Sequence, residues 1–415
     1  MMRVQVSVPG YKQIDIELNP NKRIRDLKGA ACRKLGIEPE LTRVLMNGRQ
    51  LKENSAISQL KSTNAPVILD YIWARQLLVW GPEGQRKLRS ATVLLAGAGA
   101  IGNEAAKNLA MLGVGRIMIV DLDRVEMSNV SRMIFFHPKD LGKNKAEVLA
   151  ENIHSKYPYV ETSAYRGNLE GMPLKFYLNS EVVVCGLDNV VSRIFLTQTC
   201  RKYHIPLIDA GIVGLTGRVQ SYIPPDDTCP ICLFPANQYS NIVGLRNPCE
   251  PRPGEQTIPS FSTSISLVSS IQAQEAIKVL LGIDRFRATK QWPENTGQPL
   301  RATLFLDLKN NRYAPMKVDR NPKCIVCGKD GTARDTAIRS ELPVEAFDLK
   351  NPSKSIRKLA KIHDQNLTMY LENMHGTTRI EGQVTTRNRP IRGDYLRVLS
   401  EGRDRELHET ILKLV

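Results

Sequence analysis

A glycine-rich turn stands between two apolar runs, and its spacing is that of a nucleotide-binding turn. The apolar run 93–96 has the length of a buried strand and leads directly into the turn. Its glycines are Gly97, Gly99 and Gly102, the G-x-G-x-x-G spacing, which opens a helix. In such a turn the first glycine permits the tight bend, the second lets a phosphate approach the backbone, and the third allows close packing of helix on strand. A second apolar run ends in Asp121, whose carboxylate can bind ribose hydroxyls.

This pattern alone suits a nicotinamide or flavin dehydrogenase as well as an enzyme that uses ATP. Three polar residues, Asn129, Arg132 and Lys145, follow within one βα unit and supply an amide, a guanidinium and an ammonium group. A triphosphate needs that much positive charge and hydrogen-bond donation. The two phosphates of a dinucleotide usually need only the helix N-terminus. The cluster therefore favours ATP.

Two C-x-x-C pairs, Cys229 with Cys232 and Cys324 with Cys327, predict a tetrahedral zinc site. Each pair is a local chelate, so a long spacer between them is no obstacle once the fold brings them together. A redox role is less favoured because neither pair opens a thioredoxin-like helix. The site is expected to be structural, in a reducing compartment.

A valine-rich run, residues 182–184, reads as a buried parallel strand, and Asp188 lies just past its carboxyl end. Ligands of open α/β sheets bind at that edge. A carboxylate beside a triphosphate there is suited to hold Mg²⁺. The alternative is that Asp188 only caps the next helix.

Several ordered motifs resemble one family, the adenylation domains of ubiquitin-activating enzymes and their bacterial sulfur-carrier relatives. The motifs are GAGAIGNEAAKNLAMLGVG, DLDRVEMSNVSR, DLGKNKAEV and VVCGLDN, and the resemblance covers residues 71–330. It implies ATP-dependent adenylation of the C-terminal glycine of a ubiquitin-like protein. It places Asp121 on the ribose, Asn129, Arg132 and Lys145 on the phosphates, and Asp188 on Mg²⁺.

The resemblance also assigns roles to Arg75 and Cys249. An arginine at the position of Arg75 reaches the ATP phosphates of the other subunit, which implies a homodimer. Cys249 lies in a proline-rich segment and is therefore expected in a loop. It matches the cysteine that forms a thioester in the family. One departure is Met133, where the family usually has glutamine, and it puts the fine geometry of the site in doubt.

The first 70 residues predict a small β-grasp domain with the order ββαββ. The stretch TRVLMNGRQLKENSAISQL resembles ubiquitin itself. Ubiquitin functions through a free C-terminal tail, whereas here the chain continues into the next domain, so this module cannot be an activated substrate. It is expected to be either a docking or regulatory element or a packing appendage.

After Lys329 the chain becomes polar and basic through Arg339, which indicates a linker, and then alternates again. Strands are expected at 344–349, 367–371, 395–399 and 410–415, with a helix over 353–363. The pattern is compatible with a second β-grasp and resembles the ubiquitin-fold domain that recruits conjugating enzymes. The expected domains are thus residues 1–70, 71–332 and 333–415.

Composition excludes some classes of protein. No apolar run approaches the length of a membrane span, and the N-terminus lacks a signal-peptide core, so we expect the chain in the cytoplasm. The net charge of +16 comes from scattered basic residues without a nucleic-acid motif, which favours acidic protein partners over nucleic acid.

The expected fold is thus α/β, a doubly wound Rossmann-like adenylation domain with structural zinc and two flanking β-grasp domains. The expected function is activation of a ubiquitin-like modifier with ATP, Mg²⁺ and Zn²⁺, through a thioester on Cys249 and transfer to a conjugating enzyme. The alternatives are a sulfur-carrier adenylyltransferase without the thioester, a non-catalytic scaffold subunit, and a dehydrogenase.

Overall fold

The structure, a computed structural model, describes residues 1–62, 66–234, 259–329 and 331, and beyond these the strands of the C-terminal segment. The chain forms two compact units. One joins Met1–Ala91 with Leu109–Gly115 and Ile277–Gln298, and the other holds Thr92–Asn108, Arg116–Ala276 and Pro299–Val415. The division into three domains at residues 70 and 332 stays a prediction.

The N-terminal module is a five-stranded sheet with one helix, which contains the predicted ββαββ order and adds one short strand, Arg49–Gln50, before the last strand. Its elements are β1 (Met2–Val8), β2 (Lys12–Leu18), α1 (Ile24–Leu35), the 3-10 helix η1 (Pro39–Leu41), β3 (Thr42–Met46), β4 (Arg49–Gln50), η2 (Ile57–Ser62) and β5 (Val67–Tyr71). The strand order is β2-β1-β5-β3-β4, with β1 and β5 parallel. Alternate residues of β1, namely Val4, Val6 and Val8, are buried, which is the period-two pattern of a sheet covered on one face.

This module is joined to helix α2 (Leu77–Ser90) by a partly buried polar contact within the first unit. The hydroxyl of Tyr71 donates to Glu38 at 2.6 Å, and the other carboxylate oxygen of Glu38 lies 3.3 Å from Nε of Arg89. The Arg89 guanidinium also lies over the Trp73 ring, 5.3 Å from its centroid. Contacts of this kind hold the end of β5 against α2. The choice between docking element and packing appendage stays open.

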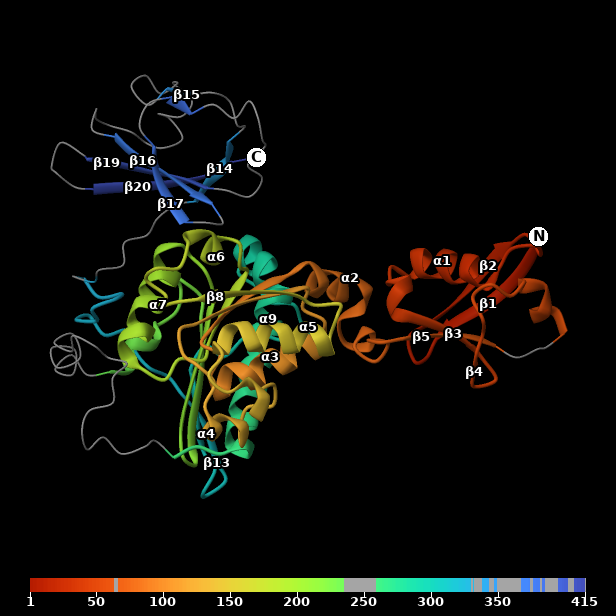
Figure 1. The fold of residues 1–415 in the computed structure, drawn as a ribbon, viewed down its shortest axis with the longest axis horizontal. Coiled ribbons are helices and arrows are strands. Elements are labelled where there is room, and N and C mark those ends of the chain that lie inside the picture. The colour runs from red at the N-terminus through yellow and green to blue at the C-terminus, as the bar shows by residue number, and fades with distance from the viewer. Residues whose placement is uncertain are drawn as a thin grey trace. The chain divides into compact units, whose positions relative to one another are not determined.

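An eight-stranded sheet forms the centre of the second unit (Figure 1). Its strands are β6 (Thr92–Ala96), β7 (Arg116–Asp121), β8 (Glu161–Arg166), β9 (Val182–Cys185), β10 (Leu207–Val213), β11 (Thr216–Tyr222), β12 (Thr303–Asp307) and β13 (Arg312–Met316). The order is β13-β12-β11-β10-β9-β6-β7-β8, parallel from β10 to β8 and antiparallel in the rest.

The order of strands reverses at β6, because β7 follows on one side and β9 on the other. The carboxyl ends of β6 and β9 therefore border a topological switch point, where ligands bind in open α/β sheets. All residues of β6 and β9 are buried, as expected for parallel strands covered on both faces. The predicted doubly wound fold is confirmed.

The helices of this part of the chain cover both faces of the sheet. They are α3 (Ala100–Leu112), α4 (Met127–Val130), η3 (Pro138–Asp140), α5 (Lys145–Lys156), α6 (Leu174–Leu178), α7 (Val190–Lys202), η4 (Pro230–Leu233) and α9 (Ser262–Thr289). The start of α3 packs on the face that carries Leu95, whereas α7 shares a core with Leu94 and Ala96 on the opposite face. Within the described part of the chain, every helix is too short or too polar to cross a bilayer.

The C-terminal segment contributes strands only, among the residues described there. They are β14 (Ile338–Leu342), β15 (Phe347–Asp348), β16 (Leu367–Asn373), β17 (Gly376–Ile380), β18 (Gln383–Val384), β19 (Tyr395–Glu401) and β20 (Leu407–Leu414). The main sheet has the order β14-β20-β19-β16-β17. The last strand thus pairs with its predecessor β19, whereas in the N-terminal β-grasp the last strand lies between β1 and β3. On its other side β20 lies parallel to β14, the first strand of this segment, as β5 lies parallel to β1 in the N-terminal module. A second β-grasp here stays a prediction, and the helix expected at 353–363 lies outside the described residues.

Candidate nucleotide site and metal centre

The glycine turn is closed by backbone packing against the end of β9. A Cβ on Gly97, whose φ is +97°, would lie 2.8 Å from the carbonyl oxygen of Gly186. A Cβ on Gly102 would lie 2.0 Å from the carbonyl oxygen of Gly97. Gly186 is as tightly placed, since its Cβ would lie 2.9 Å from the amide nitrogen of Gly102. Gly186 directly follows the valine-rich strand and is not among the site residues predicted from the sequence.

Gly99 differs from these glycines because its surroundings are open. A Cβ there would come no closer than 3.8 Å to the Gly186 carbonyl oxygen, an ordinary contact. Packing therefore does not require glycine at this position. The absence of a side chain leaves the backbone before α3 accessible, as the approach of a phosphate to the helix N-terminus requires.

Asp121 fixes the glycine turn with both of its carboxylate oxygens. Oδ2 accepts from the backbone N–H of Ala98 at 2.7 Å, and Oδ1 accepts from the N–H of Asp123 at 2.8 Å. Burial raises the pKa of Asp121, while Lys145 and the two N–H donors oppose that effect. Each oxygen keeps a second lone pair for a hydroxyl donor, so the expected ribose contact is compatible with this geometry.

Lys145 is the first residue of α5 and interacts electrostatically with Asp121. Its Nζ donates to Asp123 at 2.9 Å, and the side chain is largely buried. The preceding residue, Asn144, caps α5 by accepting from the N–H of Glu147 and donates to the carbonyl oxygens of Asp121 and Asp123. Asn144 is not among the site residues predicted from the sequence, although an asparagine followed three residues later by glutamate is typical of a helix N-terminus.

Asn129 and Arg132 are placed differently from one another. Asn129 is buried and closes the N-terminus of α4, because its Oδ1 accepts from the N–H of Glu126 at 2.9 Å. Arg132 is half-buried and donates to the carbonyl oxygen of Ser128 at 2.8 Å. A phosphate contact by either residue stays a prediction. Met133 is buried, so the departure from the family pattern falls on a core side chain.

Asp188 follows β9 and is exposed. The next residue, Asn189, caps α7 by accepting from the N–H of Ser192 at 2.8 Å. The alternative reading of Asp188 as the helix cap is therefore wrong. No direct hydrogen bond joins Asp188 or Arg132 to the glycine turn among the residues that the structure describes. Exposed Arg75 lies in the first unit, and Cys249 lies outside the described residues.

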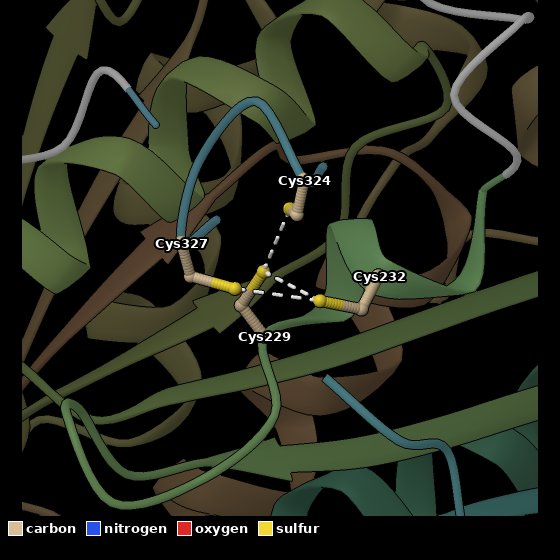
Figure 2. Close-up of side chains that lie close together, drawn as sticks. All are labelled: Cys229, Cys232, Cys324 and Cys327. Atoms are coloured by element: carbon tan, nitrogen blue, oxygen red, sulfur yellow. Dashed lines mark hydrogen bonds between the residues drawn. The ribbon is translucent and has the colours of Figure 1, made fainter. Parts of the chain in front are cut away.

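The four predicted zinc ligands come together in one buried cluster (Figure 2). Sulfur–sulfur distances are 3.7 Å from Cys229 to Cys232, 3.6 Å from Cys229 to Cys324, and 3.3 Å from Cys232 to Cys327. Tetrahedral zinc with bonds of about 2.3 Å places its sulfur ligands about 3.8 Å apart. The cluster therefore fits a closed zinc site without an open position. The remaining described cysteines, Cys32, Cys185 and Cys200, are buried core residues.

Comparisons with known proteins agree with this geometry. The ThiF family model matches residues 73–326, and the ubiquitin family model matches residues 4–69. A sulfur carrier protein adenylyltransferase of Thermus thermophilus is 32% identical over 61% of this chain and 89% of its own length. The SAMP-activating enzyme E1 of Haloferax volcanii is 31% identical over 66% of this chain and 91% of its own length. The catalytic subunit of the NEDD8-activating enzyme E1 of Saccharomyces cerevisiae is 37% identical over 34% of this chain and 50% of its own length.

The match to the first family model covers the sheet, the glycine turn and three of the four clustered cysteines, ending one residue before Cys327, and it spans more than half of the chain. The chain therefore belongs to the ThiF family and carries an N-terminal module of the ubiquitin family.

Proposed function

We propose that this protein activates a small ubiquitin-like protein by adenylating its C-terminal carboxylate with ATP. The observation that carries the proposal is the chain of contacts from the glycine turn to Lys145. Asp121 holds Ala98 with one oxygen and Asp123 with the other, and Asp123 pairs with the Lys145 ammonium. A lysine fixed beside the turn at a switch point supplies positive charge that a triphosphate needs and a dinucleotide does not.

In the proposed reaction, a carboxylate oxygen of the C-terminal glycine attacks the α-phosphorus of ATP. The bond from that phosphorus to the bridging oxygen breaks, and pyrophosphate leaves with the electron pair. An acyl-adenylate remains. Because the substrate is itself the nucleophile, the enzyme contributes positioning and charge neutralisation. In this scheme Asp121 binds the ribose, and Asn129, Arg132 and Lys145 bind the phosphates.

Asp188 is the residue proposed to hold Mg²⁺. It is exposed at the carboxyl end of β9, and the helix cap that would compete for its carboxylate is supplied by Asn189. Carboxylate oxygens suit this cation. When bound, Mg²⁺ would neutralise part of the phosphate charge. Zn²⁺ in the cysteine cluster would be structural, since all four positions are filled by protein ligands.

The proposal includes a homodimer in which Arg75 reaches the phosphates bound by the partner subunit. Arg75 is exposed in the first unit, which leaves its guanidinium available for such a contact. The exposed position and the family membership support this part of the proposal.

In the fuller form of the proposal, the thiolate of Cys249 attacks the acyl carbon of the adenylate. A carbon–sulfur bond forms, the carbon–oxygen bond to phosphate breaks, and AMP leaves. The thioester is then transferred to a conjugating enzyme, with the C-terminal segment as the recruiting part. The likeness to a SAMP-activating enzyme and to a NEDD8-activating subunit supports this form.

A second candidate is a sulfur-carrier adenylyltransferase that stops at the acyl-adenylate. The likeness to the Thermus thermophilus enzyme, which extends over 89% of that protein, favours it. Both candidates use the same ATP residues and differ only at Cys249.

The two candidates are separated by incubating the enzyme with ATP and small ubiquitin-like proteins and running a nonreducing gel. The fuller proposal predicts an adduct that a thiol reductant removes. The Cys249→Ala variant should keep ATP–pyrophosphate exchange and form no adduct, because it lacks only the acceptor sulfur. Exchange without an adduct in the wild type would establish the sulfur-carrier candidate instead.

A further inference from the structure

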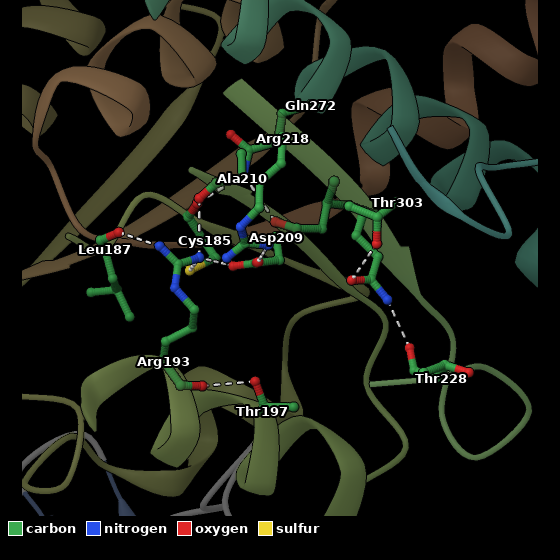
Figure 3. Close-up of polar contacts among 12 residues, drawn as sticks. Cys185, Leu187, Arg193, Thr197, Asp209, Ala210, Arg218, Thr228, Gln272 and Thr303 are labelled. Atoms are coloured by element: carbon green, nitrogen blue, oxygen red, sulfur yellow. Dashed lines mark hydrogen bonds and ion pairs between the residues drawn. The ribbon is translucent and has the colours of Figure 1, made fainter. Parts of the chain in front are cut away.

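A buried carboxylate next to the candidate nucleotide site is shared by two arginines (Figure 3). Asp209, on β10, is fully buried. One of its oxygens accepts from Arg193 of α7, and the other accepts from Arg218 of β11. Its backbone lies in register with Cys185, the last residue of β9. This arginine–aspartate cluster therefore lies at the carboxyl edge of the sheet, one residue before the level of Gly186.

Arg193 does more than pair with Asp209. Its Nη1 also donates to the carbonyl oxygen of Ala210 at 3.0 Å and lies 3.4 Å from the sulfur of Cys185. Its Nη2 donates to the carbonyl oxygen of Leu187 at 2.6 Å. The planar guanidinium thus ties the loop after β9 to the neighbouring strand β10. A lysine at this position has one donor centre and cannot span these acceptors at once.

The loop tied by Arg193 is the one that carries Asp188. The first residue of this loop is bound to β6, because the N–H of Gly186 donates to the carbonyl oxygen of Ala96 at 2.7 Å. Asp188 therefore projects from a segment fixed at Gly186 and at Leu187. No other side chain donates to the Leu187 carbonyl among the residues that the structure describes.

The charge of the arginine–aspartate cluster also favours an interaction with Asp188. Two guanidinium groups share one carboxylate, so the cluster carries one excess positive charge, and Arg193 is almost completely buried. Burial lowers the pKa of Arg193, and among the charges that oppose this effect is Asp188. The exposed carboxylate is thus attracted towards the cluster from the solvent side.

We propose that Arg193 is a positioning residue, which holds the 186–188 loop so that the Asp188 carboxylate is oriented for the metal-bound nucleotide. The inference deepens the proposed function and rests on it for the identity of the ligand. Arg218 completes the pairing of Asp209, and within the described part of the chain its side chain makes no hydrogen bond to the 186–188 loop.

The test compares Arg193→Lys with Arg218→Lys in the full-length protein. Both variants make the same chemical change on the same carboxylate, but only the first removes the bond to Leu187. Hydrogen exchange of peptides that contain residues 186–189, measured without nucleotide, should be faster in Arg193→Lys and unchanged in Arg218→Lys. This readout does not depend on enzyme activity.

Calorimetric titration with α,β-methylene-ATP, with and without Mg²⁺, gives the second readout. Arg193→Lys should lose about tenfold of the gain in affinity that Mg²⁺ provides, the lower end of what outer-shell partners of metal ligands contribute. Affinity without Mg²⁺ should stay near the wild-type value. Adding Arg193→Lys to Asp188→Asn should cause no further loss, because residues that act through one group are not additive.

Equal effects of the two arginine variants on exchange and on affinity would show that the cluster only stabilises the fold, and would overturn the inference. A loss of affinity in Arg193→Lys that is the same with and without Mg²⁺ would also overturn it. Faster exchange confined to Arg193→Lys in an enzyme that lacks ATP–pyrophosphate exchange would leave the positioning role standing and refute the proposed function.

Discussion

Replacement by alanine should have different effects at two glycines of the nucleotide turn: it should lower the stability of the protein at Gly102 and the affinity for nucleotide at Gly99. A methyl group on Gly102 would lie 2.0 Å from the carbonyl oxygen of Gly97, so the two atoms would have to separate by on the order of 1 Å. A methyl group on Gly99 meets its nearest neighbour at 3.8 Å, so nothing needs to move. Gly102→Ala therefore disturbs the packing of the turn. Gly99→Ala leaves the packing intact and only covers backbone that a phosphate would approach.

We expect Gly102→Ala to destabilise the protein by about 1–3 kcal/mol, the usual cost of overpacking a close-packed interior. For a unit of this size each kcal/mol lowers the melting temperature by about 2 °C. Gly99→Ala should leave stability within about 0.5 kcal/mol of the wild type. It should nevertheless weaken binding of α,β-methylene-ATP, because the added methyl group stands where the phosphate approaches the backbone.

Thermal unfolding followed by near-ultraviolet circular dichroism, together with calorimetric titration of the nucleotide, measures both effects on the same samples. Wild-type stability in Gly102→Ala would show that the turn is not packed as described. Wild-type affinity in Gly99→Ala would show that the phosphates do not approach this part of the backbone.

Further predictions concern the metal centre, the dimer and the buried carboxylate. Elemental analysis should find one zinc ion per chain. The Cys232→Ser variant should lose this ion and melt at a lower temperature, because metal binding contributes folding free energy. A wild-type protein that contains no zinc and keeps its stability would contradict this prediction. Arg75→Ala and Lys145→Ala should each abolish ATP–pyrophosphate exchange. When equal amounts of both variants are mixed, about half of the dimers are heterodimers with one intact site, so about a quarter of the wild-type exchange should return. No recovery after verified subunit exchange would count against a shared site. Because burial raises the pKa of Asp121, the carboxyl gains a proton at a higher pH than an ordinary aspartate. The protonated oxygen is a weaker acceptor for its backbone N–H donor, so nucleotide affinity should fall on acidification from above the ordinary aspartate range. Asp121→Asn should be weak and show no such fall.

The elements around the glycine turn could be predicted from sequence because their signals are local. A short apolar run, the glycine spacing and the following helix identify β6 and α3 without knowledge of the rest of the fold. Each C-x-x-C pair is likewise a local chelate, so the cluster could be predicted although its pairs are far apart in the chain. The alternating strands of the N-terminal module gave its β-grasp order in the same way.

Contacts that depend on tertiary packing could not be predicted. The residue type of Asn129 suggests a phosphate ligand equally well as a helix cap, and only the backbone around Glu126 shows that its oxygen is engaged. Asp209 and Arg193 meet because β10 lies beside β9, which no spacing in the sequence reveals. The order of the C-terminal strands is also a matter of long-range pairing, and alternation alone does not determine it.

The central claim is that ATP is used to activate the C-terminal carboxylate of a ubiquitin-like protein. The most direct measurement is exchange of labelled pyrophosphate into ATP, with the full-length enzyme and a small ubiquitin-like protein whose C-terminal glycine is either free or amidated. We expect exchange with the free carboxylate and none with the amide, which has no oxygen able to attack the α-phosphorus, and Lys145→Ala should abolish it. Exchange that proceeds equally with the amidated protein, or without any added protein, would contradict the proposed reaction.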